Sequence, residues 1–140
     1  DIGVAVDTPS GLMVPKIRNC ESLGLLELSR RCTDIVAKAR DGKLSVEELN
    51  DGTFTVTNLG MYGLDFFTAV INPPEAAILA VSAAKKQPIA DGDIIRVALT
   101  ANFCLSADHR ILDGAMCAKF LTRVRDYLET PGLMSLRAGV

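Results

Sequence analysis

The segment from Leu105 to Ala115, with the sequence L-S-A-D-H-R-I-L-D-G-A, contains the side chains best suited to catalysis. His109 is the only histidine of the chain and stands where an apolar strand pattern ends and an amphipathic helical pattern begins. Such a junction lets two rigid elements hold one side chain in a cleft. Because imidazole is the commonest general acid–base group in enzymes, His109 is well placed for catalysis.

The same residues also have ordinary structural explanations. His109 could be a neutral imidazole that is hydrogen-bonded at the end of a strand. Asp113 stands just before Gly114 and an apolar helical pattern, which is typical of a helix N-cap. Arg110 fits an ion-pair partner or a solvated side chain. The motif H-x-x-x-D-G is short, so it does not decide between these interpretations by itself.

Strand patterns and helical patterns alternate irregularly along the chain, without a regular strand–helix repeat. We expect strands at 2–6, 12–17, 53–58, 75–81 and 94–107, and helices at 22–39, 45–49 and 113–129. The run 75–81 would also suit a short helix, but its flanking prolines and lysines favour a strand. Pro15 indicates a sheet edge or a bulge, and Ser45 with Glu48 forms a capping box. The pattern predicts an α/β (α+β) fold in which helices pack on a mixed sheet.

Composition excludes several classes of protein. The 140 residues are 49% hydrophobic and carry a formal net charge of −2, with no cluster of Lys and Arg, so no nucleic acid or membrane partner is expected. No apolar run approaches the ~18 residues that cross a bilayer. The four cysteines stand far apart, which predicts free buried thiols in a reducing compartment and no zinc site: Cys20, Cys32, Cys104 and Cys117.

Three blocks of sequence resemble one known family. The first is D-H-R-I-L-D-G-A at 108–115, followed by the amphipathic helix and the ending Tyr-Leu-Glu-x-Pro. The second is F-T-V-T-N-L-G-M-Y-G at 54–63 with V-I-N-P-P-E-A-A-I-L-A-V at 70–81, and the third is D-I-G-V-A-V-D-T-P-S-G-L-M-V-P at 1–15. In this order and spacing they resemble the catalytic domain of the dihydrolipoamide acyltransferases of 2-oxo acid dehydrogenase complexes.

The resemblance implies a partial two-layer fold like that of chloramphenicol acetyltransferase, assembled as homotrimers that form a larger core. It also implies active sites between neighbouring subunits. The expected partners are a lipoyl domain and the decarboxylase and dihydrolipoamide dehydrogenase components, in a bacterial cytoplasm or a mitochondrial matrix. A family catalytic domain is longer than this chain, so we expect residues 1–140 to be its C-terminal portion, with the lipoyl and subunit-binding domains absent.

The same resemblance assigns three catalytic positions: His109, Asp113 and Thr57. The implied reaction moves an acyl group from S-acyl-dihydrolipoamide to coenzyme A, which is a substrate, while the lipoyl group is carried on another domain. No residue is assigned to coenzyme A binding, and no metal is expected. The motif with Asn58 and Asn72 looks more like acetyl-transferring members, with branched-chain or succinyl specificity as alternatives. A non-catalytic core paralogue and another CoA-dependent acyltransferase are the remaining alternatives.

Simple acid–base chemistry constrains the three roles. Free thiols titrate about two pH units above free imidazole, so full proton transfer to His109 would be uphill by roughly 2.7 kcal/mol unless it is coupled to attack. Thr57 would donate a hydrogen bond to the oxyanion, although a cross-strand threonine with an exposed hydroxyl is the plain alternative. A carboxylate paired with the imidazole would favour imidazolium, so we do not expect Asp113 to complete a catalytic triad. The resemblance implies instead that Asp113 braces the turn through a salt bridge to an arginine that precedes Asp1.

Overall fold

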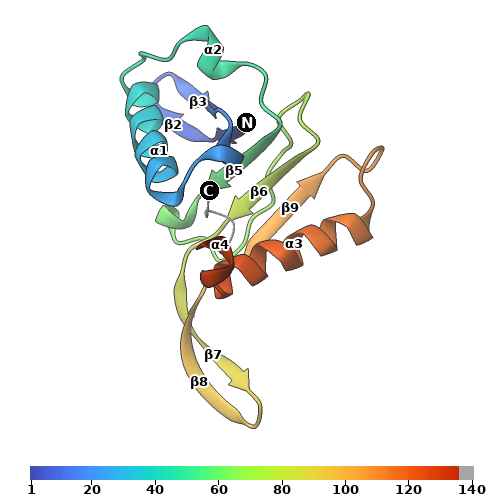
Figure 1. Cartoon of the computed structure of the whole chain (residues 1–140). Coiled ribbons are helices and arrows are strands. Elements are labelled where there is room, and N and C mark those ends of the chain that lie inside the picture. The colour runs from blue at the N-terminus through green and yellow to red at the C-terminus, as the bar shows by residue number, and fades with distance from the viewer. Residues whose placement is uncertain (136–140) are drawn as a thin grey trace.

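A five-stranded mixed sheet forms the centre of the computed structural model, which describes residues 1–135 (Figure 1). The strands follow the order β4 (Lys16–Ile17), β1 (Ile2–Val4), β5 (Phe54–Asn58), β6 (Ala77–Val81) and β9 (Phe103–Ala107). Strands β1, β5 and β6 are parallel, and β4 and β9 run antiparallel to their neighbours. The last five residues, 136–140, which we assign to the same domain, lie outside the described residues.

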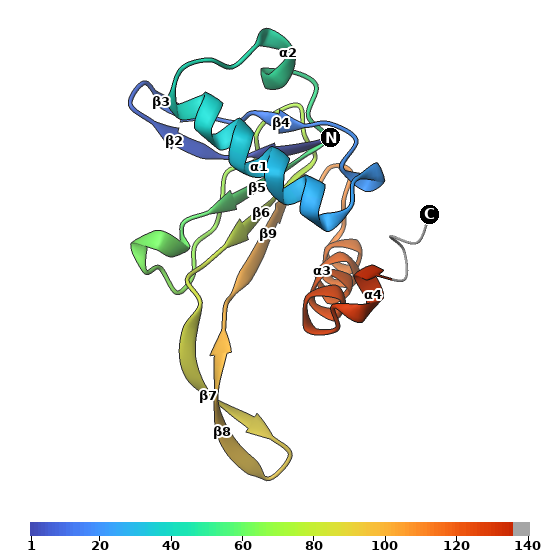
Figure 2. The ribbon, with the colours of Figure 1, turned by 60° about the vertical axis from the view of Figure 1, so that its left-hand side comes forward.

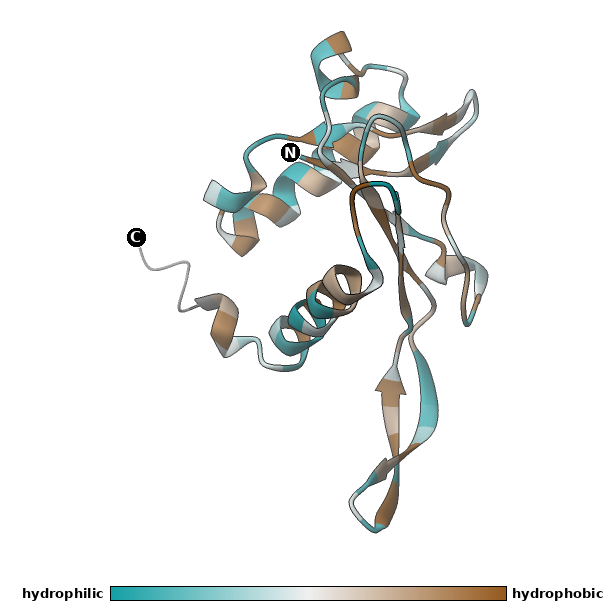
Figure 3. Ribbon diagram, turned by 90° about the vertical axis from the view of Figure 1, so that its right-hand side faces the viewer, coloured by the Kyte–Doolittle hydropathy of each residue, from teal (hydrophilic) through white to brown (hydrophobic). Residues whose placement is uncertain are grey.

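Two long helices cover one face of this sheet, so the expected mixed-sheet fold in two layers is confirmed (Figure 3). Helix α1 (Leu25–Arg40) packs on β4 and on β2 (Val6–Thr8), and α3 (Gly114–Glu129) packs on β9. Strand β6 is buried along most of its length, from Ala77 to Ala80. This burial explains its continuous apolar sequence, because a parallel strand inside a sheet needs apolar side chains on both faces.

The two strands predicted near the N-terminus are each split into two. Strand β1 continues into β2, and β3 (Gly11–Met13) continues into β4, so that β2 and β3 form a small hairpin beside the main sheet. Pro15 lies between β3 and β4 and is fully buried. Its carbonyl accepts a hydrogen bond of 2.9 Å from the Val4 amide. Strand β4, which follows Pro15, is the edge strand of the sheet, so the prediction of an edge or bulge is confirmed at the edge. Proline is tolerated there because it has no amide proton to donate to a neighbouring strand.

Helices α1 and α2 (Val46–Leu49) confirm the predicted helical segments. Ser45 and Glu48 form the expected capping box, and the backbone amide of Ser45 helps to lower the pKa of Glu48. Helix α1 starts at Leu25, three residues later than predicted. Its predicted apolar face is buried at Ile35 and Ala39, but Leu25 is 71% exposed.

The predicted long strand 94–107 is wrong, because the chain breaks at Ala101 and Asn102. Its first part, β8 (Ile94–Thr100), pairs with β7 (Lys85–Asp91) in a separate hairpin, and its second part is β9. Asn102 bonds to Ser82 through both its amide and its carbonyl, and its side chain donates to the carbonyl of Asp65 at 2.8 Å. Strand β7 was not predicted, since its lysines and proline hide a strand pattern.

The β7–β8 hairpin projects away from the rest of the chain (Figures 1 and 2). In the antiparallel register Ile95, Val97 and Leu99 share one face with Ala90 and Pro88. Side chains Ile95, Val97 and Leu99 are 79%, 69% and 70% exposed. The hairpin therefore presents a row of apolar side chains that nothing in residues 1–135 covers.

Helix α3 is also only partly covered. It begins at Gly114, one residue after the predicted start, ends at Glu129 as predicted, and is followed by a short helix α4 (Gly132–Ser135). None of its residues is fully buried, although Phe120 packs against Phe54 with ring centroids 5.6 Å apart.

The four cysteines are free thiols, as predicted, but they are half-buried rather than buried. No helix among the described residues is long and apolar enough to cross a bilayer.

Candidate functional site

The turn that carries His109 joins β9 to α3. Strand β9 ends at Ala107, and the amide of Asp108 donates to the carbonyl of Ala76 at 2.9 Å, so the turn is tied to the start of β6. The amides of Ile111 and Leu112 then donate back to the Asp108 carbonyl. The side chain of His109 is exposed, and within residues 1–135 it makes no hydrogen bond. His109 is thus held by its backbone and keeps both ring nitrogens available.

Asp108 and Arg110, on either side of the histidine, form an ion pair. Arg110 donates to the Asp108 carboxylate from Nε at 2.9 Å and from Nη2 at 2.6 Å, and its backbone amide donates at 3.0 Å. The Arg110 side chain and then its amide lower the pKa of Asp108 to about 2. This pKa lies below that of an aspartate in the unfolded chain, which is about 3.9. The ion pair therefore stabilises the folded turn fully above about pH 3.9, and this stabilisation is lost as the pH falls through about 2. Asp108 therefore stays charged beside His109 at neutral pH.

A cavity of about 420 Å³ opens beside His109. One wall is the turn from Ala107 to Arg110, and the other is the segment with Ile71, the cis-linked Pro73 and Pro74, and Glu75. This second wall belongs to the N-P-P-E block found in the sequence. Two of the three blocks therefore meet around the histidine.

Thr57 lies on the other side of the sheet from α3. Phe54 contacts Phe120 of α3, and side chains alternate along a strand, so Thr55 and Thr57 point from the opposite face. Thr57 is half-buried. Its position in β5 is one from which a side chain could face a substrate.

The structure does not bring Thr57 and His109 together within one chain. Thr57 pairs with Ala80 of β6, and Ala80 pairs with Cys104 of β9. The chain must run from Cys104 past Ala107 before it reaches His109, which is more than about 10 Å along the strand direction. The two side chains therefore belong to opposite ends of the sheet.

Asp113 is the N-cap of α3. Its Oδ1 accepts a hydrogen bond of 2.8 Å from the amide of Met116, and its carbonyl accepts one of 3.1 Å from Cys117. The described part of the chain contains no hydrogen bond or ion pair between Asp113 and His109. The N-cap interpretation is confirmed.

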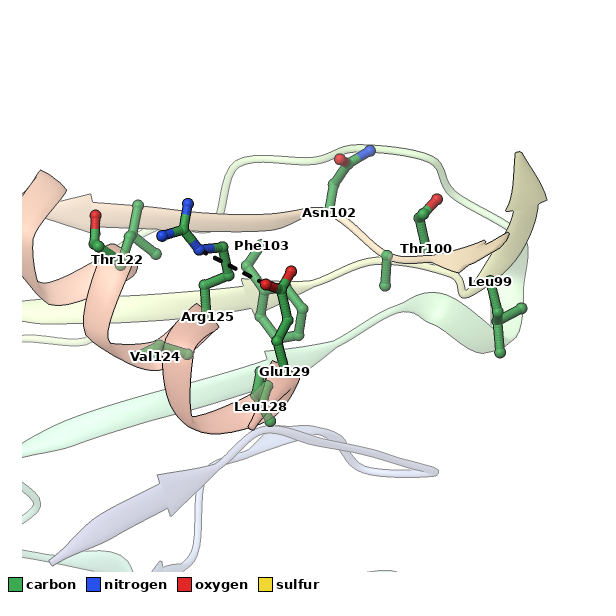
Figure 4. A pocket seen from close by; sticks show the side chains of 11 residues that line it. Leu99, Thr100, Asn102, Phe103, Thr122, Val124, Arg125, Leu128 and Glu129 are labelled. Carbon is green, nitrogen blue, oxygen red and sulfur yellow. Dashed lines mark ion pairs between the residues drawn. The ribbon is translucent and has the colours of Figure 1, made fainter. Parts of the chain in front are cut away.

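A larger cavity of about 500 Å³ lies between α3 and the junction of β8 with β9 (Figure 4). Arg125 and Glu129 face one another at its rim, at 4.0 Å, and Leu128 and Phe103 point into it. This cavity is on the α3 face, away from Thr57, and at the opposite end of β9 from His109. Among residues 1–135 no group of three or more His, Cys, Asp or Glu is placed to hold a metal ion.

Comparisons with known proteins give one consistent answer. Residues 1–136 match the family model of the 2-oxoacid dehydrogenases acyltransferase (catalytic domain). The acetyltransferase component of the pyruvate dehydrogenase complex of Rickettsia felis is 43% identical over 96% of the chain, and the mitochondrial one of Schizosaccharomyces pombe is 48% identical over 94%. A succinyltransferase component of Cupriavidus necator is 41% identical over 97%.

Solved structures agree with the sequence matches. The dihydrolipoamide acetyltransferase of Azotobacter vinelandii superposes with a TM-score of 0.91 at 42% identity, over 95% of this chain and 55% of that one. That structure addresses the roles of a serine, a histidine and an asparagine in its catalytic mechanism. The cubic core of a pyruvate dehydrogenase complex gives a TM-score of 0.92 at 41% identity, with the same coverage.

The fold and the matched residues are those of part of an acyltransferase catalytic domain. The chain belongs to the 2-oxoacid dehydrogenase acyltransferase family. It spans about a third of the length of the curated relatives, namely 32% for Rickettsia felis and 28% for Schizosaccharomyces pombe.

Sequence reasoning proposed the histidine, the threonine and the aspartate as site residues but missed one feature of the cavity beside His109. The cavity wall at Glu75 is backed by a buried ion pair with Lys16. Lysine between Pro15 and Ile17 in an apolar stretch was the available signal, because a charge there must either reach solvent or find a partner.

The N-cap generates a stability prediction. Asp113→Ala should lower the free energy of unfolding by about 1 kcal/mol, because α3 loses its side-chain cap. Asp113→Asn is the matched control, since asparagine caps as well as aspartate does and should stay within a few tenths of a kcal/mol of the parent. Urea unfolding followed by circular dichroism measures both. Equal losses in the two variants would show that the carboxylate charge, and not the cap, stabilises this region.

Proposed function

We propose that the protein transfers an acyl group, with acetyl preferred, from S-acyl-dihydrolipoamide to coenzyme A. The observation that carries this proposal is His109, which lines a cavity at a strand–helix junction in a chain that matches the acyltransferase catalytic domain over residues 1–136. Residues 1–140 are then the C-terminal portion of that domain. Coenzyme A is a substrate, and the lipoyl group arrives on another domain.

Residue spacing supports the assignment of His109, Thr57 and Asp113. In the Azotobacter vinelandii acetyltransferase the serine precedes the histidine by 52 positions, and the asparagine follows the histidine by four. The separations of Thr57 and Asp113 from His109 are the same. Threonine carries a hydroxyl, as that serine does, and aspartate carries a side-chain oxygen, as that asparagine does.

The chemistry assigns a task to each of these side chains. His109 accepts the proton of the coenzyme A thiol while the sulfur attacks the thioester carbonyl, and it then returns the proton to the leaving dihydrolipoyl sulfur. Thr57 donates its hydroxyl hydrogen bond to the oxyanion of the tetrahedral intermediate. Asp113 holds the start of α3, which keeps the His109 turn in place. An asparagine at this position in a working relative would do the same, so no carboxylate triad is needed.

The separation of Thr57 from His109 supports an active site that forms between subunits. Each site takes Thr57 from one chain and His109 from the next, in a ring closed by a heterologous interface. The uncovered apolar face of the β7–β8 hairpin and the partly covered α3 support contact with neighbouring subunits in a homotrimer, because contiguous exposed apolar side chains mark interaction sites.

Assembly extends beyond the trimer in the same proposal. The trimers form a larger core, with the decarboxylase and dihydrolipoamide dehydrogenase components and the lipoyl domain as partners. The solved relative from a pyruvate dehydrogenase complex is described as its cubic core, which supports this arrangement. The relatives include bacterial and mitochondrial proteins, which supports a bacterial cytoplasm or a mitochondrial matrix as the location.

A mixed-subunit experiment tests the catalytic assignment. His109→Ala should lower kcat about 10²–10⁴-fold, and Thr57→Ala about 10²–10³-fold, whereas Thr57→Ser keeps the hydroxyl and should remain active. Equal amounts of the two inactive full-length variants, reassembled together, should recover about a quarter of the parent rate, because one interface in four then has both intact side chains.

The outcomes of the mixing experiment separate three possibilities. No recovery on mixing would place both groups in one subunit. Near-normal turnover of His109→Ala alone would remove its assignment as the base. A rise in the KM for coenzyme A without a change in kcat would make Thr57 a binding residue rather than an oxyanion donor.

The acyl group is tested with three substrates. The full-length protein should acylate dihydrolipoamide from acetyl-CoA with a kcat/KM at least about tenfold above that for isobutyryl-CoA or succinyl-CoA. A higher value for either competitor would support branched-chain or succinyl specificity instead. Turnover with none of the three, in a correctly assembled protein, would support a non-catalytic core paralogue. Transfer only to a small hydroxylated acceptor would indicate another CoA-dependent acyltransferase.

The hairpin generates a prediction about assembly. Val97→Glu should weaken trimer formation on the order of 100-fold, because the charge would be buried without a partner in the interface. Gln87→Glu places the same charge on the other face of the hairpin and should leave the mass unchanged. Sedimentation at several concentrations measures the mass of both variants. An unchanged mass for Val97→Glu would show that this face lies outside the interface.

A further inference from the structure

A charged pair lies buried behind the cavity beside His109. The ammonium group of Lys16 bonds to Oε1 of Glu75, and each of the two side chains is only 2% exposed. A buried carboxylate or ammonium group that loses its partner strongly destabilises a protein. The two charges therefore depend on one another for their burial.

The carboxylate of Glu75 has further partners that complete its hydrogen bonding. The hydroxyl of Thr55, which is fully buried, donates to Oε2 at 2.5 Å, and the amide of Asn72 donates to Oε1 at 3.3 Å. Within residues 1–135 no buried side-chain nitrogen or oxygen is left without a partner. The network thus joins β4, β5 and the segment before β6.

Two glycines leave the space that this network occupies. A Cβ on Gly52 would lie 2.5 Å from Nζ of Lys16 and 2.6 Å from Oε1 of Glu75. A Cβ on Gly3 would lie 2.7 Å from Oγ1 of Thr55 and 2.8 Å from Nζ of Lys16. Any larger residue at either position would push the charged groups apart.

The position of Glu75 connects the network to both halves of the site. Thr55 is two residues before Thr57 and points from the same face of β5. Glu75 itself lines the His109 cavity, and the next residue, Ala76, accepts the amide of Asp108. One carboxylate therefore contacts the strand of Thr57 and shapes the wall against which the His109 turn rests.

Stability alone does not explain a buried ion pair. Apolar side chains of similar volume in place of such a pair often leave stability unchanged or raise it. Apolar groups, however, cannot hold the segment 72–75 through directed hydrogen bonds. The ion pair of Lys16 and Glu75 therefore fixes the position of Glu75 and of the cavity wall at 72–75.

We propose that Lys16 and Glu75 are positioning residues for acyl transfer, which hold the 72–75 wall and the Thr57 strand in register with the His109 turn. This inference rests on the proposed function. Glu75 provides the hydrogen-bond acceptors, and Lys16 neutralises and orients it. Thr57 and His109 of one chain lie at opposite ends of the sheet, so each chain contributes to two intersubunit sites. The ion pair of Lys16 and Glu75 therefore acts on both of these sites.

An apolar replacement separates positioning from stability. The triple variant Lys16→Met, Thr55→Val, Glu75→Leu in the full-length protein keeps the volume of the network and removes its charges and hydrogen bonds. It should assemble normally and unfold within a few degrees of the parent. Its kcat should fall about 10–100-fold while the KM for coenzyme A and for dihydrolipoamide changes less than about twofold, because the reacting groups are misplaced rather than unbound.

A matched control and a second variant keep the result decisive. Glu27→Gln removes an exposed ion pair with Arg31 on α1 and should change neither stability nor kcat. Glu75→Gln keeps the size of the side chain and should also lower kcat without changing KM. An assembled triple variant, or an assembled Glu75→Gln, with kcat within twofold of the parent would overturn the proposal.

The remaining outcomes distinguish failure of the positioning proposal from failure of the proposed function. If both variants fail to assemble, the pair is a requirement of folding and the positioning assignment is wrong. If the unmodified protein itself transfers no acyl group to or from coenzyme A, the proposed function fails first. Loss of kcat in the variants of an active parent, with the wall 72–75 displaced in their crystal structures, would support the proposal.

Discussion

The carboxylate of Glu75 imposes the strongest constraint on this fold, because a buried charge must be paired and hydrogen-bonded wherever it is placed. Its partners come from three separate elements, Lys16 of β4, Thr55 of β5 and Asn72 of the segment before β6. The edge strand, the central strand and the segment must therefore meet in one arrangement. The cavity wall beside His109 is built on that arrangement.

The sheet determines how the candidate catalytic groups are presented. Strand β6 pairs with β5 on one side and β9 on the other, so the register of two ladders sets the offset between Thr57 and His109. That offset is too large for one chain to use both groups on a single thioester. The same surfaces that are left uncovered, on α3 and on the hairpin, are those that a neighbouring subunit would cover.

Local sequence patterns predicted the elements whose signals are local. The capping box at Ser45 and Glu48, the N-cap at Asp113 and the amphipathic period of α1 and α3 all depend on residues within a few positions of one another. They were therefore visible without the fold. The predicted strand 94–107 failed because its break at Asn102 depends on Ser82, twenty residues away in sequence, which no local pattern records.

The sequence by itself determined the family and the fold class and singled out His109, Thr57 and Asp113 as candidates, because these depend on residue types in fixed order and spacing. Only the tertiary structure decided which of these groups meet. It placed Thr57 and His109 at opposite ends of one sheet and made Asp113 a helix cap. It also paired Lys16 with Glu75 across 59 positions of sequence. Such a pair forms only when the chain closes on itself, since burial and not sequence proximity selects the partner of a charge.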